Sequence, residues 1–148
     1  MSKKSPKIAA LLEGLQGRAL DAHYLGFFEC FNQQLFYESH DVLEELWLPV
    51  RHETKGDFYR GLIQLAGAFV HLQKNRLGPA AALFQRSREN LQRYAPAYEQ
   101  LEVMNVLQLI DDWLARTKAS GSNENPLNRF PAPKLELLPE LDRSPPRS

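Results

Sequence analysis

Residues 31–50, FNQQLFYESHDVLEELWLPV, and residues 58–72, FYRGLIQLAGAFVHL, decide the fold of this chain. If the second stretch is a helix with 3.6 residues per turn, its apolar residues lie on all sides of that helix, which is typical of a helix at the centre of a bundle. In the first stretch they recur on one side, at Phe36, Leu43 and Trp47, which predicts an amphipathic helix packed against that centre. The sequence therefore predicts an all-α fold.

The flanking sequence predicts three more helices, at residues 21–32, at 79–93, and from a start between Tyr98 and Asn105 to an end near Ser120. Two glycines in the central helix, Gly61 and Gly67, each cost about 1 kcal/mol of helix propensity relative to alanine. Such glycines favour a close approach by a neighbouring helix, which compensates for that loss. The helices together make a compact bundle of about five members.

The end of the chain has a different composition. Six of the ten prolines fall in residues 120–148, so this segment cannot be helical for long. We expect one helical domain at residues 1–119 and an extended or disordered proline-rich tail at 120–148. Several leucines could hold part of the tail against the bundle, namely Leu135, Leu137, Leu138 and Leu141.

Composition limits the classes of function. Eighteen basic and eighteen acidic residues cancel, so no global field attracts nucleic acid or an anionic membrane. The longest uncharged apolar run, residues 61–70, is far shorter than the ~20 residues that span a bilayer, and Glu13 interrupts the apolar part of the N-terminal stretch. The single Cys30 fits a reducing compartment. These features predict a soluble, cytoplasmic protein that binds neither nucleic acid nor membrane.

The same two stretches resemble the family called domain of unknown function 309, over about residues 24–92. The resemblance rests on an asparagine that ends the first helix, a histidine triplet and a Glu and Trp in the second helix, and a Gly-Leu-Ile-Gln start to the central one. Here these are Asn32, Ser39-His40-Asp41, Glu44, Trp47 and Gly61-Leu62-Ile63-Gln64. Ser39, Asp41 and Pro79 depart from the family pattern. The resemblance implies a compact helical fold, and the family has sometimes been labelled a predicted metal-dependent hydrolase.

The candidate site starts from His40 and Glu44, which are four residues apart and therefore lie on one side of a helix, close enough to share a hydrogen bond or a metal ion. His71 would supply a third metal ligand, and Gln64 would orient a water molecule. In a metal-assisted hydrolase a carboxylate, Glu44 or Asp41, would act as the base. A divalent metal is the cofactor that this interpretation requires.

Other interpretations of the same residues stay open. The segment from His40 to Glu44 is only half of a His-Glu-x-x-His zinc motif, and the paired Glu-x-x-His motifs of di-iron bundles do not occur. His40, Glu44, Gln64 and His71 would equally form a structural polar core, or line a pocket for a small ligand. The favoured hypothesis is a small interaction or ligand-binding module. Its partner is an unidentified protein or small molecule, a homo-oligomer is possible, and whether the protein is an enzyme is left open.

Overall fold

The computed structural model describes residues 6–14, 20–119 and 124–139. Six α-helices and three short 3-10 turns follow one another in this part of the chain, and it contains no β-strand, so the predicted all-α class is confirmed. The helices are α1 Pro6–Gly14, α2 Ala22–Asn32, α3 Phe36–Trp47, α4 Gly56–Gln73, α5 Leu77–Leu91 and α6 Val103–Ala119. The 3-10 turns are η1 Leu48–Val50, η2 Gln92–Tyr94 and η3 Pro126–Asn128.

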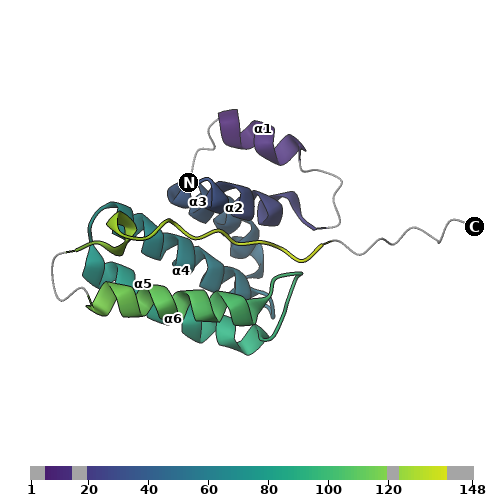
Figure 1. Cartoon of the computed structure of the whole chain (residues 1–148). Coiled ribbons are helices and arrows are strands. Elements are labelled where there is room, and N and C mark those ends of the chain that lie inside the picture. The colour runs from purple at the N-terminus through teal and green to yellow at the C-terminus, as the bar shows by residue number, and fades with distance from the viewer. Residues whose placement is uncertain (1–5, 15–19, 120–123, 140–148) are drawn as a thin grey trace, which may run out of the picture.

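Helix α4 is the centre of the bundle. Twelve of its 18 residues are buried, as its apolar residues on all sides require. In Figure 1 it lies between the α2–α3 pair and the α5–α6 pair. The apolar surface that α4 presents on every side is therefore covered by four other helices.

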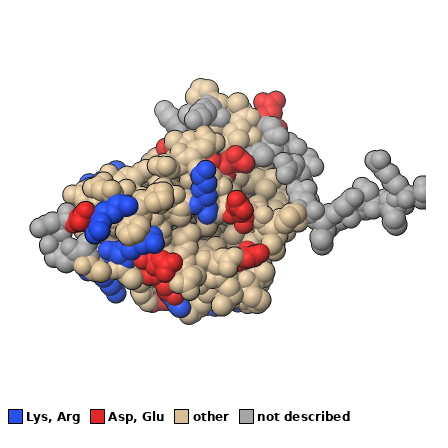
Figure 2. Space-filling model, in the orientation of Figure 1, with Lys and Arg blue, Asp and Glu red and all other residues tan. Residues whose placement is uncertain are grey.

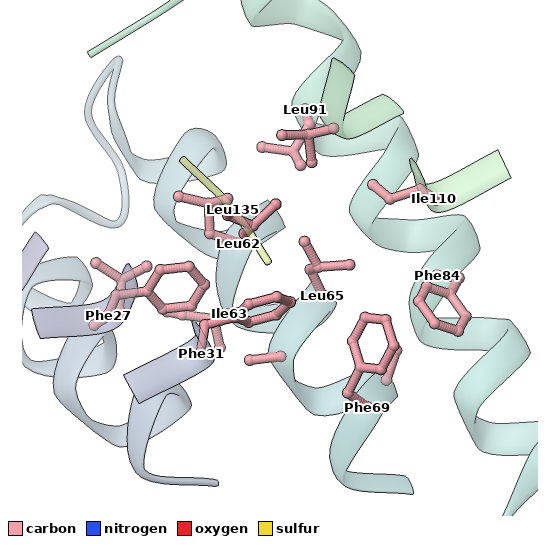
Figure 3. Packing of buried hydrophobic residues seen from close by; sticks show 14 of the residues in the cluster. Phe27, Phe31, Leu62, Ile63, Leu65, Phe69, Phe84, Leu91, Ile110 and Leu135 are labelled. Atoms are coloured by element: carbon pink, nitrogen blue, oxygen red, sulfur yellow. The ribbon is translucent and has the colours of Figure 1, made fainter. Parts of the chain in front are cut away.

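One side chain of α4 touches all four of these helices. Phe69 is fully buried, and its ring lies against one aromatic ring from each of them. The distances between ring centroids are 5.6 Å to Phe31, 5.0 Å to Phe36, 5.2 Å to Phe84 and 5.0 Å to Trp113. Figure 3 shows Phe69 facing Phe84 across the α4–α5 contact. Aromatic pairs of this geometry contribute roughly 0.5–1.5 kcal/mol each beyond the burial of their surface.

Helix α5 approaches α4 closely at Gly61. A Cβ added there would lie 2.7 Å from Leu91 Cγ, and Leu91 is fully buried. The carbonyl of Gly61 accepts a hydrogen bond of 2.6 Å from the buried Ser87 hydroxyl. At Gly67 the contact is looser, since a Cβ would lie 3.1 Å from one methyl group of the half-buried Leu83. The close helix approach expected from these glycines is thus present, most tightly at Gly61.

Two details of the helices differ from the sequence-based expectation. Helix α1 was not predicted, because a nine-residue helix with Ile8 and Leu12 as its buried apolar residues gives too short a periodic pattern. It packs on a small cluster formed by Ala22, Cys30 and Val42. Helix α5 begins at Leu77, two residues before Pro79. Pro79 still lies in the first turn, where its missing amide hydrogen removes no helical hydrogen bond.

Apart from the turn η3, the described part of the proline-rich segment is extended, and it lies on the bundle. We call residues 124–139 the strap, drawn in yellow in Figure 1, where it crosses in front of the helices. Leu135 is 4 % exposed and belongs to the main core, and Leu137 forms an isolated antiparallel bridge with Leu101. Leu141 lies outside the described residues. No helix in the described chain is long and apolar enough to cross a membrane.

The two glycine contacts give a stability test. We expect Gly61→Ala to lower the free energy of unfolding by roughly 1–3 kcal/mol, because Leu91 is buried and has no room to move. Gly67→Ala is the matched control, since Leu83 can shift and alanine raises helix propensity by up to about 1 kcal/mol. Urea unfolding of both variants measures the difference. A Gly61→Ala protein as stable as the Gly67→Ala protein would contradict this account of the α4–α5 contact.

Candidate functional site

Helix α3 carries most of the candidate residues on one side. Phe36, Ser39, Val42 and Leu43 are buried, and the Ser39 hydroxyl donates a hydrogen bond of 2.8 Å to the carbonyl of Phe36. Because these residues fix one side of α3 against the bundle, the remaining side faces outward. His40, Asp41 and Glu44 lie at the boundary between the two and are only partly exposed.

His40 is placed between two carboxylates. Its Nδ1 lies 3.5 Å from Oδ1 of Asp41 and 3.8 Å from Oε2 of Glu44, and the His40 side chain is 32 % exposed. The Nδ1 atom itself is buried and makes no hydrogen bond. The four-residue spacing therefore brings His40 and Glu44 to ion-pair distance, but the geometry for a hydrogen bond at Nδ1 is not met.

Gln64 and His71 both lie on α4, but only the side chain of Gln64 makes a hydrogen bond that links α4 to another helix. Gln64 Oε1 accepts a hydrogen bond of 2.7 Å from the side-chain amide of Asn90, which links α4 to α5. His71 Nδ1 is buried and makes no hydrogen bond. Burial lowers the pKa of His71 below the ordinary histidine value, and the charges of Arg76 and Lys74 lower it further.

The described residues do not assemble the metal site considered from the sequence. No group of three or more His, Cys, Asp or Glu side chains in this part of the chain is arranged to hold a metal ion. His40, Glu44 and His71 accordingly do not form a three-ligand cluster. Gln64, which was assigned the role of orienting a water molecule, is bonded to Asn90 instead.

The outward side of α3 has a composition that the sequence-based analysis missed. Tyr37 is 58 % exposed and Leu48, just after the helix, is 45 % exposed. Asp41 and Glu44 lie between them on the same side of the helix, since the spacings are four, three and four residues. We call Tyr37, His40, Asp41, Glu44 and Leu48 the α3 stripe. Their positions opposite the buried face would have identified Tyr37 and Leu48 as exposed.

The charges of the α3 stripe are not neutralised by basic residues. Among the described residues, the ion-pair contacts of Asp41 and Glu44 are with His40 alone, and no Lys or Arg reaches them. Other carboxylates of the bundle do have such partners, as in the pairs Lys55–Glu99 and Arg88–Asp111. One helical turn beyond Glu44, the indole Nε1 of Trp47 is buried and makes no hydrogen bond. The outward side of α3 thus offers acidic oxygens to solvent, whereas Trp47 packs against the main core.

A second histidine contact on α3 links two helices. His23, near the start of α2, places Nε2 2.9 Å from Oε2 of Glu45 and Nδ1 3.4 Å from Oδ1 of Asp21. The Asp21 carboxylate also caps α2 by accepting a hydrogen bond of 2.7 Å from the His23 amide. His23 and Glu45 are 22 positions apart on different helices, so no local spacing in the sequence indicates this contact.

His71 gives this region a pH test. Because its pKa is lowered in the folded state, the unfolded chain binds the proton more tightly, and stability falls as the pH drops through the ordinary histidine value of about 6.5. We expect urea unfolding midpoints of the wild type to fall further between pH 7.5 and pH 5.5 than those of His71→Gln. His52→Gln, at an exposed loop position, is the control. Equal falls in the wild type and His71→Gln would count against the unfavourable surroundings described for His71.

Comparison with known proteins adds one finding. The model of the family described as Domain of unknown function (DUF309) matches residues 24–91, from the first turn of α2 to the end of α5. No curated protein and no solved structure matches the chain. The match contains every candidate residue on α3 and α4, whereas α6 and the strap lie beyond it.

Proposed function

The chain belongs to the DUF309 family through residues 24–91, and from this premise and the chemistry of α3 we propose that the protein is a small interaction module. Its binding surface is the α3 stripe, and its partner is a cationic segment of another protein. The family description names no activity, so the proposal rests on the residues of the stripe. The observation that carries it is the pair of carboxylates, Asp41 and Glu44, that no Lys or Arg of the described chain neutralises.

The chemistry of the stripe suits a positively charged side chain. Two carboxylates one turn apart attract a Lys or Arg, and the exposed ring of Tyr37 offers a face for a cation within the same turn. Leu48 adds an apolar contact at the end of the stripe. A basic amphipathic helix, with cationic and apolar side chains at helical spacing, matches this order of groups.

The geometry supports binding better than catalysis. A general base acts through hydrogen-bond contact of about 2.6–3.2 Å, whereas His40 Nδ1 lies 3.8 Å from Glu44 Oε2. The metal-dependent hydrolase built on His40, Glu44 and His71 remains a prediction from the sequence, and nothing in the arrangement of the described residues favours it. A cytoplasmic location likewise remains a prediction.

The stripe can be tested by photo-crosslinking in the cell from which the protein is taken. A photoreactive residue in place of Tyr37 should form a discrete adduct with one partner, which mass spectrometry identifies. The matched control is the same residue in place of Met104 on α6, because Met104 is 56 % exposed and Tyr37 is 58 % exposed. Equal labelling from both positions would contradict a specific surface on α3.

The partner identified in this way gives a quantitative prediction. We expect the double variant Asp41→Asn, Glu44→Gln to bind it about tenfold more weakly, because two surface ion pairs of up to about 1 kcal/mol each are lost. Glu29→Gln, Glu136→Gln makes the same change in net charge at exposed positions elsewhere and should bind as the wild type does. Titration calorimetry at low and high salt measures both. Equal affinities for the two double variants would refute the role of these carboxylates.

A further inference from the structure

The strap is held on the bundle in the manner of a bound peptide. At its centre, one side chain satisfies both main-chain polar groups of Leu135. Asn32 Nδ2 donates to the Leu135 carbonyl at 2.8 Å, and Asn32 Oδ1 accepts from the Leu135 amide at 2.7 Å. Asn32 is the last residue of α2. Its side-chain amide pairs with the main chain of Leu135 through one donated and one accepted hydrogen bond, as the edge strand of a sheet pairs with an added extended peptide.

Two other anchors hold the ends of the strap. The side-chain amide of the buried Asn125 donates to the carbonyl of Leu72, near the end of α4. At the other end, the amide of Leu138 donates to the carbonyl of Gln100 at 2.7 Å, beside the Leu101–Leu137 bridge. The strap is thus fixed at three separated points.

The chain between these anchors depends on side-chain contacts. Pro131 and Pro133 have no amide hydrogen, and residues 131–134 make no main-chain hydrogen bond to the helices in the described structure. The ring of Phe130 lies 3.9 Å from the guanidinium carbon of Arg116 on α6, and Leu135 enters the core among the residues shown in Figure 3. Proline-containing segments are recognised in this way by other proteins, because their extended conformation is already formed.

We call the surface that holds the strap, around Asn32, Leu72 and Gln100, the groove. The strap does not fill this groove completely. A hollow of about 440 Å³ runs beside residues 134–139 and is bounded on its other side by Glu102, just before α6, and by Asn105 and Leu109 of α6. Figure 2 shows this face of the molecule, where most of the surface is uncharged and acidic and basic side chains are interspersed. A groove of this composition selects its occupant by shape and apolar anchors more than by charge.

The residues that match the family model include part of the groove but none of the strap. Two of the groups that hold the strap, the Asn32 side chain and the Leu72 carbonyl, lie within residues 24–91, whereas the strap begins more than thirty residues later. We propose that the groove is a peptide-binding site for an extended, proline-containing segment of another protein with a leucine anchor. The strap occupies this site as an internal stand-in for that segment. This site is separate from the α3 stripe and does not depend on the function proposed for it.

Exchange of the strap tests this proposal. A protease site inserted between Ala119 and Glu124 of the full chain allows the strap to be cut from the bundle after folding. A fluorescent peptide with the sequence of residues 124–139, ENPLNRFPAPKLELLP, is then titrated and its anisotropy measured. We expect saturable binding to the cut protein and at least tenfold weaker binding to the uncut protein, because a tethered strap competes at an effective concentration near the millimolar range.

Two controls make the outcome decisive. A peptide carrying Leu135→Asp should bind the cut protein at least tenfold more weakly, and Asn32→Ala in the bundle should weaken the unmodified peptide. Loss of helical circular dichroism when the strap is released would overturn the proposal, because the strap would then be an obligatory part of the core. A cut protein that never exchanges its strap would overturn it as well. So would an uncut chain that forms a dimer by exchanging straps, since the occupant would then be a second copy.

Discussion

The contact of Phe69 with four helices is the constraint on which the bundle depends. A fully buried aromatic side chain in the last third of α4 needs neighbours on every side, and Phe31, Phe36, Phe84 and Trp113 provide them from α2, α3, α5 and α6. Removing such a ring from a packed core typically costs 3–5 kcal/mol, which is a large part of the stability of a domain of this size. The order of helices around α4 follows from this packing.

The same constraint decides which surfaces stay free. Because α3 turns its buried face toward α4 and α2, its opposite side is left to carry Tyr37, Asp41, Glu44 and Leu48 without a function in packing. Because α2, α4 and α6 do not close completely around the core, Leu135 of the strap enters it from outside. The two surfaces proposed for binding, the α3 stripe and the groove, therefore result from how the helices surround α4. The helices leave polar groups uncovered at the stripe and apolar groups uncovered at the groove.

The sequence predicts the fold better than the site, for physical reasons. Periodicity identifies α4 and its amphipathic neighbours, because burial on one side or on all sides repeats every 3.6 residues. A spacing of four residues places His40 beside Glu44, yet the missing hydrogen bond at His40 Nδ1 depends on side-chain rotamers that no pattern encodes. The contact between Asn32 and Leu135 joins residues 103 positions apart and leaves no local signal. The helix α1 has only nine residues, which is too short for its apolar residues to form a recognisable period.

Native-state hydrogen exchange tests most directly whether the bundle around α4 and the strap are separable. The amides of Leu65 and Phe69 report on α4, and the amides of Leu135 and Leu138 report on the strap, since each of the latter makes a defined hydrogen bond. We expect the α4 amides to exchange only through global unfolding, and the strap amides to exchange through a local opening of much lower free energy. Strap amides that share the opening free energy of Phe69 would contradict this account, because the strap would then be inseparable from the core.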